Sequence, residues 1–213
     1  LIGSFNQPKS VIISTDILKT LNKRDIKSGY AEILKYSFIY DKKFFNWLVK
    51  NGKKVISLHT ESCVYAIKKS CSIKSKIVSI DEKEKGIRDL LNFGHTFGHA
   101  IEAITGYKNK IKHGEAIFIG MHLAIKFSTL LKICKKDVLE KYSSHLKNLK
   151  INYKLSDYNI RISPEAFLRY MKFDKKIKNN KIKLILIKDI GSPIRLFLEN
   201  EKLLSNFLKN ELK

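Results

Sequence analysis

The sequence predicts a mainly α-helical protein with a few short strands. Along most of the 213 residues, apolar side chains recur every three or four positions, as on the buried faces of amphipathic helices. Hydrophobic residues make up 44% of the chain and charged residues 29%, which is typical of a globular protein with a sizeable core. We therefore expect a helical body, with strands only near its two ends.

The individual elements follow from caps, turns and periodicity. A β-branched run after Gln7-Pro8 predicts a short strand at residues 11–14. Thr15-Asp16 should then cap a helical turn that ends by Leu21. Longer helices are expected at residues 28–39, 41–52, 60–79, 87–105, 113–131, 136–149, 164–172 and 201–212. Two more strands, at 183–187 and 195–198, should flank a turn at 191–193.

Composition narrows the functional classes. The net charge of +22 fits either nucleic-acid binding or an enzyme for anionic substrates. Lysines are spread through helices and loops alike, so most of this charge reflects composition, and a basic nucleic-acid-binding helical domain is kept only as an alternative. Three cysteines without a CxxC pair indicate reduced thiols. No apolar run reaches the ~20 residues of a membrane span, and no signal peptide opens the chain. We therefore expect a cytoplasmic protein without a membrane partner. We also expect no nucleic-acid partner.

The most informative stretch is residues 86–102. We expect it to lie in one helix, on which four polar residues line a single face that we call the polar stripe: Arg88, Asn92, His95 and His99. Burying such a stripe between apolar flanks is costly unless it surrounds a polar ligand. Gly94 and Gly98 each cost about 1 kcal/mol in a helix interior, which indicates that a ligand or a second backbone comes close to the histidines. The alternative is a pair of hydrogen-bonded histidines on an ordinary amphipathic helix.

Two further residues complete a candidate metal site. His113 begins a helix, and Glu32 lies within an apolar helical face where an unpaired carboxylate would be expensive. Lys35, three positions after Glu32, leaves open the alternative of a surface ion pair. Two imidazoles and one carboxylate suit zinc, cobalt and related ions and leave a coordination position open. We predict that Glu32, His95 and His113, the metal triad, bind a divalent ion.

Three motifs together resemble those of 3-dehydroquinate synthase. They are Ser-Gly-Tyr-Ala-Glu-Ile-Leu-Lys at 28–35, Gly-His-Thr-Phe-Gly-His-Ala at 94–100, and His-Gly-Glu-Ala at 113–116. Lys74, Asp81-Glu82 and the Asp-Lys-Lys run at 174–176 extend the match, which covers essentially the whole chain. The resemblance implies that residues 26–213 are the helical metal- and substrate-binding domain of the dehydroquinate synthase-like fold. Residues 1–25 would be a remnant of its N-terminal α/β NAD-binding domain, which is otherwise largely missing.

The resemblance also implies a reaction and a set of site residues. Members convert 3-deoxy-D-arabino-heptulosonate 7-phosphate to 3-dehydroquinate and phosphate, the second step of the shikimate pathway to aromatic amino acids. They use NAD and a divalent metal, usually zinc or cobalt, and are usually homodimers. The metal triad matches the family's ligands. Residues matching substrate-contacting positions are Lys35, Lys74, Arg88, Asn92, His99 and Lys175. Residues matching a short NAD-contacting segment are Ile17, Leu18, Lys19 and Thr20.

The main departure from the family is the missing N-terminal half with its glycine-rich NAD loop. We therefore expect that this chain alone binds NAD poorly, does not complete turnover, and begins inside a larger protein. Another sugar phosphate cyclase, or a relative of the iron-type alcohol dehydrogenases, would share the metal triad. Such relatives would not need the full set of Lys74, Arg88, Asn92 and His99.

Overall fold

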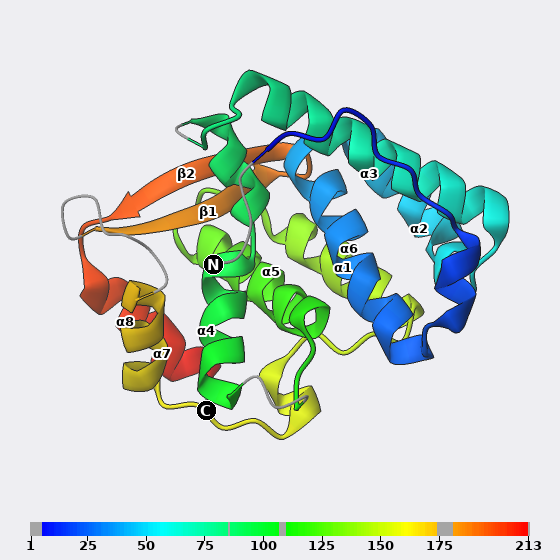
Figure 1. Cartoon of the computed structure of the whole chain (residues 1–213). Coiled ribbons are helices and arrows are strands. Elements are labelled where there is room, and N and C mark those ends of the chain that lie inside the picture. Colours follow the sequence, from blue (N-terminus) through cyan, green and yellow to red (C-terminus); the bar gives the residue numbers. More distant parts are fainter. Residues whose placement is uncertain (1–5, 85, 107–109, 174–180, 213) are drawn as a thin grey trace.

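The computed structural model describes residues 6–84, 86–106, 110–173 and 181–212, which form a helical body with one small hairpin (Figure 1). The helices and strands are η1 (Asp16–Thr20), α1 (Lys23–Tyr40), α2 (Lys42–Ile56), α3 (Thr60–Ile80), η2 (Ile87–Asn92), α4 (His95–Thr105), α5 (His113–Leu130), α6 (Lys136–Asn148), η3 (Leu155–Tyr158), α7 (Pro164–Phe173), β1 (Ile182–Asp189), β2 (Ser192–Leu198) and α8 (Glu201–Glu211), where η denotes a 3-10 helix. The predicted mainly α-helical class is confirmed.

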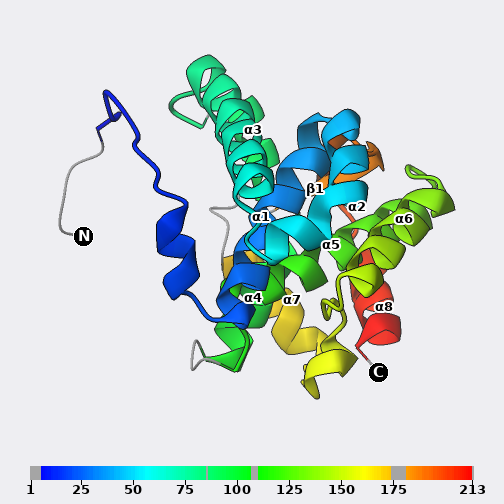
Figure 2. The same ribbon diagram turned by 90° about the vertical axis from the view of Figure 1, so that its right-hand side faces the viewer.

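Helix α5 is the centre of the body. Between Ala116 and Ser128 every residue except Lys126 is buried, because α4, α1, α6 and strand β1 all pack against it. Figure 2 shows α1 and α6 beside α5, with α7 and α8 at the opposite end of the body. A helix that is apolar on nearly all sides is expected only where other elements surround it. The core of the protein therefore lies along α5. His113 is the first residue of this helix.

The hairpin of β1 and β2 covers part of this core. The strands pair antiparallel from Ile182 opposite Leu198 to Asp189 opposite Ser192. Residues Leu184 to Ile187 of β1 are buried on both faces, and β1 packs on α5 while β2 contacts α1. The turn is tied to the helical body, since the backbone N–H of Gly191 donates to the carbonyl of Phe38 over 2.7 Å.

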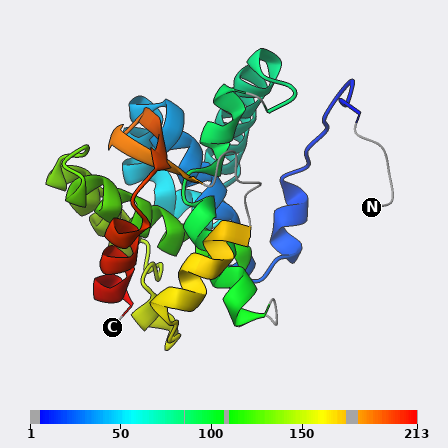
Figure 3. The ribbon, with the colours of Figure 1, turned by 90° about the vertical axis from the view of Figure 1, so that its left-hand side faces the viewer.

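The N-terminal segment differs from the prediction. Residues 11–14 form no strand, and Val11, Ile12 and Ile13 are exposed, Ile12 by 94%. Figures 2 and 3 show residues 6–14 standing apart from the helical body, whereas Leu18 of the following turn packs against the core. A β-branched run becomes a strand only when a second strand accepts its hydrogen bonds, and the described residues offer none there. The predicted helical turn does form as η1.

Three helix boundaries also differ. Helix α1 begins at Lys23, capped by the side chain of Asn22, and not at Ser28. Helix α2 continues through Gly52 to Ile56, and Gly52 is glycine because a Cβ there would lie 2.7 Å from the Tyr30 hydroxyl. The expected helix at 87–105 is two elements, η2 and α4, separated by Phe93 and Gly94. The helices expected from 60, 113, 136, 164 and 201 are confirmed within a residue or two.

No helix within the described ranges is both long enough and apolar enough to cross a membrane.

Candidate metal centre

Glycines bring the helices that carry the metal triad close together. A Cβ placed on Gly120 of α5 would lie 2.0 Å from the carbonyl oxygen of Gly94, and one on Gly98 of α4 would meet Ile117 at 2.8 Å. Gly94 itself has φ +80°, a left-handed conformation that ends η2 and starts α4. The sequence predicted that a ligand or a second backbone approaches these glycines, and the structure shows the backbone of α5 there, with the Ala116 carbonyl oxygen 3.2 Å from a Cβ on Gly98.

A similar contact joins α5 to α1. A Cβ on Gly114 would lie 1.9 Å from the carbonyl oxygen of Ser28, and the Gly114 N–H donates to the Ser28 hydroxyl over 3.0 Å. The Arg24 guanidinium of α1 also donates two hydrogen bonds to the carboxylate of Glu115, each with a nitrogen–oxygen distance of 2.6 Å. Ser28 therefore satisfies the first turn of α5 and does not cap its own helix. These contacts place Glu32, one turn after Ser28, beside His113.

The metal triad comes together from three helices. One donor atom each from Glu32 of α1, His95 of α4 and His113 of α5 lie within 4.8 Å of one another. Glu32 Oε1 is 3.5 Å from His95 Nε2 and 3.8 Å from His113 Nε2. Neighbouring ligands of a tetrahedral zinc ion are about 3.4 Å apart, given metal–ligand bonds of about 2.1 Å. The two distances from Glu32 are therefore only slightly longer than those between neighbouring ligands of a tetrahedral ion.

The two oxygens of Glu32 differ in a way that fits a cation. Oε2 accepts a hydrogen bond from the Lys35 ammonium over 2.6 Å. Oε1 is buried and has no hydrogen-bond partner among the described residues. A buried carboxylate oxygen without a partner is costly, and it faces two imidazoles. A divalent ion bound by Glu32, His95 and His113 would satisfy it.

The electrostatics of the cluster favour an ionised Glu32 and a neutral His95, which are the protonation states that bind a metal ion. Burial, the largest single influence, opposes ionisation of Glu32, but His113 and Lys35 together lower the pKa of this carboxyl to about 2. Burial, followed by the charge of Lys35, lowers the pKa of His95 to about 3, so its imidazole is neutral. Hydrogen bonding to Glu102, followed by the influence of the nearby Glu32 carboxylate, raises the pKa of His113 to about 9. A metal ion would have to displace that proton, as it does when it binds any protonated ligand.

His99 lies at the edge of this cluster. Its ring centroid is 5.2 Å from that of His95 and 6.1 Å from that of His113. Together with Glu102 and His113 it forms a second group whose donor atoms lie within 4.8 Å of one another. Glu102 was missed in the sequence, although it stands seven positions after His95 and three after His99, on the same face of α4.

The two predicted lysines occupy different environments. Lys35 is only 3% exposed, and burial lowers the pKa of its ammonium against the opposing effect of Glu32. Lys74 of α3 is exposed, yet it is close enough that its charge also lowers the pKa of Lys35. Both lysines therefore border the same positively charged region next to Glu32.

The other half of the polar stripe is not on the helix of the histidines. Because Gly94 breaks the helix, Arg88 and Asn92 lie in η2, and the expected single face is wrong. The Arg88 guanidinium donates to the carbonyl of Glu82, and the Asn92 amide donates to the Glu84 carboxylate over 3.2 Å. Sequence periodicity could not show this, since apolar residues continue at helical spacing across the break.

The remaining predicted site residues lie elsewhere. Ile17, Lys19 and Thr20 are exposed in η1, with Lys19 paired to Asp16, while Leu18 borders an apolar cavity of about 230 Å³ beside α1 and α3. Lys175 lies outside the described residues. The cofactor-contacting role of the η1 residues stays a prediction.

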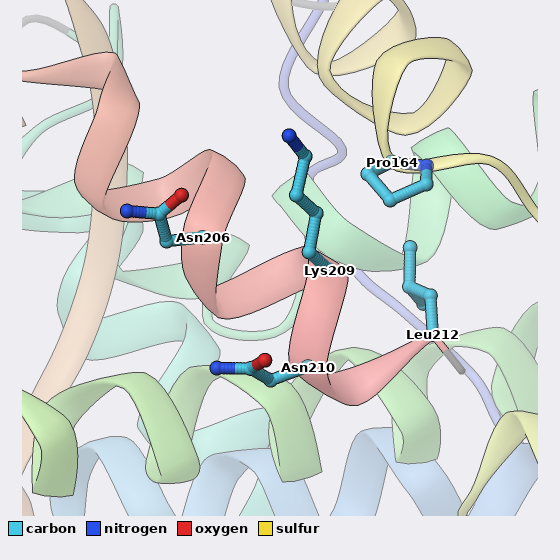
Figure 4. A pocket seen from close by; sticks show the side chains of 5 residues that line it. All are labelled: Pro164, Asn206, Lys209, Asn210 and Leu212. Atoms are coloured by element: carbon cyan, nitrogen blue, oxygen red, sulfur yellow. The ribbon is translucent and has the colours of Figure 1, made fainter.

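A larger hollow between α7 and α8 has no such chemistry. Figure 4 shows the residues that line this cavity of about 590 Å³: Pro164 at the start of α7, Asn206, Lys209 and Asn210 on α8, and Leu212 just after α8. It is lined by neither a carboxylate nor an imidazole. Of these two places, only the metal triad brings a carboxylate and two imidazoles together.

Comparison with known sequences gives consistent matches. A family model described as the 3-dehydroquinate synthase C-terminal region matches residues 29–177. The 3-dehydroquinate synthase of Pelagibacter ubique is 47% identical over 212 residues, covering 100% of this chain and 58% of that protein. The 3-dehydroquinate synthase of Vibrio atlanticus is 45% identical over 192 residues, covering 90% of this chain and 52% of that protein. The chain thus spans about half the length of the curated relatives it matches.

Solved structures show the same fold. 2-epi-5-epi-valiolone synthase from Streptomyces hygroscopicus, solved with NAD+ and Zn2+, superposes with a TM-score of 0.79 at 18% identity, over 92% of this chain and 53% of that one. 2-deoxy-scyllo-inosose synthase, solved with carbaglucose-6-phosphate, NAD+ and Co2+, gives 0.75 at 23% identity, over 93% of this chain and 55% of that one. The predicted helical domain of the dehydroquinate synthase-like fold is confirmed.

Proposed function

Because the chain belongs to the 3-dehydroquinate synthase family, we propose that it supplies the metal- and substrate-binding part of an enzyme that converts 3-deoxy-D-arabino-heptulosonate 7-phosphate to 3-dehydroquinate and phosphate. The observation that carries the proposal is the metal triad, in which the unpartnered Oε1 of Glu32 faces His95 and His113. NAD and a divalent ion, zinc or cobalt, would be its cofactors. The complete protein would be a cytoplasmic homodimer.

The triad's role follows from its donor set. Glu32, His95 and His113 would hold the ion with one net negative charge against two positive ones, so the centre stays positive. Such an ion acidifies a bound hydroxyl and polarises a carbonyl, while the hydride is carried by NAD. Lys35 fixes Glu32 through its 2.6 Å contact, which leaves only Oε1 free to face the ion.

The cationic residues around the triad would bind the substrate's charged ends. Lys35 and Lys74 form one positive edge, and Arg88 offers a planar fork suited to phosphate or carboxylate. Asn92 and His99 would contact substrate hydroxyls, and Lys175 would add a further cation. Arg88 and Asn92 now bind acceptors in residues 82–84, so a substrate must replace these contacts.

A related reaction is the second candidate. The structural matches are cyclases named for valiolone and scyllo-inosose products, and their likeness supports the fold without selecting the substrate. The sequence matches at 45–47% identity favour the dehydroquinate reaction. Turnover by the full-length gene product with 3-deoxy-D-arabino-heptulosonate 7-phosphate, and none with a hexose 6-phosphate, would separate the two.

The triad is tested by measuring bound metal in this chain. We expect one zinc or cobalt ion per chain, with affinity reduced more than about 100-fold in Glu32→Gln and in His95→Ala, because even indirect ligand partners are worth 10–100-fold. Glu140→Ala, at an exposed position of α6, is the control and should bind as the unchanged chain does. Metal content that is unaffected by Glu32→Gln and His95→Ala would refute the triad.

A further inference from the structure

Glu102 contacts the metal triad without belonging to it. Its two carboxylate oxygens lie 3.1 and 3.2 Å from His113 Nδ1, and its side chain is only 14% exposed. The opposite nitrogen of the same ring, Nε2, points to the Glu32 oxygen that lacks a partner. His113 therefore stands between two carboxylates, one at each ring nitrogen.

From this arrangement we propose that Glu102 is a positioning residue for the metal centre: it accepts the Nδ1–H of His113 and so presents Nε2 to the ion. The proposal rests on the proposed function, since it presumes a metal ion at the triad. A neutral imidazole carries one proton, and the hydrogen bond at one nitrogen decides which nitrogen is free to bind metal. A carboxylate behind a metal-bound histidine also fixes the ring's orientation and raises its basicity.

The competing interpretation makes Glu102 a direct ligand, together with His99 and His113. The hydrogen bonding distinguishes the two carboxylates. Both oxygens of Glu102 lie within hydrogen-bonding distance of His113 Nδ1, whereas Glu32 Oε1 has no partner in the described part of the chain. An ion is most favourable at the oxygen that nothing else satisfies. The geometry thus places the ion on the Glu32 side of His113 and Glu102 on the far side.

The position of His113 gives a further reason why its ring needs a positioning residue. His113 is the first residue of α5, its side chain is 48% exposed, and helix ends are the parts that fray first. His95, in contrast, is largely buried and its Nδ1 is 3.2 Å from the carbonyl oxygen of Phe93, so the backbone orients its ring. At His113 the corresponding nitrogen, Nδ1, is oriented by the carboxylate of Glu102 and not by a backbone carbonyl.

The test is zinc binding by the 213-residue chain and its variants, measured by competition with a chromophoric chelator. We expect Glu102→Ala to raise the zinc Kd by about 10–100-fold, the usual cost of losing such a partner. Glu102→Gln should cost less, because its amide carbonyl still accepts the N–H but without the charge. Glu140→Ala is again the control. Circular dichroism without metal shows whether each variant is folded.

The visible spectrum of bound cobalt separates positioning from ligation. Since the donor set would be unchanged, Co2+ in Glu102→Gln should show the same absorption bands as in the unchanged chain, whereas Glu32→Gln should alter them. An altered spectrum in Glu102→Gln would make Glu102 a ligand and overturn the proposal, as would zinc binding by Glu102→Ala at full strength. An unchanged chain that binds no ion would overturn the proposed function and this inference with it.

Discussion

The segments on either side of Gly94 hold their polar side chains by different means. On the α4 side, close backbone contacts with α5 at Gly94, Gly98 and Gly120 fix the helix that carries His95 and His99. On the η2 side, ion pairs between side chains hold the segment in place. The Asp89 carboxylate accepts a hydrogen bond from Lys183 over 3.0 Å and pairs with Arg195 at 2.9 Å, and both of these cations lie on the hairpin. The first segment is fixed by steric fit and the second by charges.

This difference would suit the roles proposed for the two segments, metal binding on the α4 side and substrate binding on the η2 side. Metal ligands must be held within a few tenths of an ångström before the ion arrives, and packed backbones provide that rigidity. Groups that bind a substrate's charged ends must exchange one partner for another. Arg88 and Asn92, now hydrogen-bonded to residues 82–84, are placed to do so. Three substitutions test this comparison.

The largest effect is expected from Gly120→Ala. The new Cβ would lie 2.0 Å from the Gly94 carbonyl oxygen, a backbone atom that can move only if α4 moves away from α5. We expect the free energy of unfolding to fall by about 3 kcal/mol, at the upper end for overpacking, and zinc affinity to fall with it. Urea denaturation measures the first and chelator competition the second.

Gly29→Ala is the matched control, because it lies in the interior of α1 and a Cβ there would meet nothing within 4 Å. That variant should be more stable by about 0.5–1 kcal/mol, since alanine loses less backbone freedom than glycine in a helix. If Gly120→Ala were as stable as Gly29→Ala, steric fit would not be what fixes the α4 side.

The accuracy of the sequence-based prediction also differs between the two sides of Gly94. Helix α5 was predicted within one residue, because its apolar pattern is unbroken, and Glu32, His95 and His113 were chosen correctly as neighbours, since the structure brings them together. The break at Gly94 was not predicted, because nothing in local periodicity distinguishes a glycine in the left-handed conformation from one inside a helix.

The other errors have a related cause. Gly52 was taken as a helix end, but it is needed inside α2 to let Tyr30 approach, a contact between residues far apart in sequence. Residues 11–14 were predicted as a strand from their own composition, yet a strand depends on a neighbour that composition does not supply. Propensity describes a residue by itself, whereas these outcomes depend on what packs against it.

A smaller effect is expected from Asp89→Ala on the η2 side. Its carboxylate is 8% exposed, but the cations it binds, Lys183 and Arg195, are about one third exposed and can be solvated after its loss. We therefore expect the free energy of unfolding to fall by about 2 kcal/mol, less than for a fully buried pair. Zinc affinity should change less than threefold, because α4 keeps its contact with α5. A tenfold loss of zinc affinity would mean that η2 and the triad form one rigid unit.

The smallest effect on stability is expected from Arg88→Ala. Its guanidinium donates to a loop carbonyl and not to a buried carboxylate, so we expect a loss of at most about 1 kcal/mol in urea denaturation. In the full-length gene product, however, the same change should lower kcat/KM at least 100-fold, and Arg88→Lys should restore little of it, because an ammonium cannot contact two phosphate oxygens with a planar fork. A variant that unfolds more easily than Asp89→Ala but turns over normally would assign Arg88 to the scaffold. Loss of turnover with stability intact would instead show that the η2 side exchanges its loop partners for substrate, while the α4 side keeps its ligands in place.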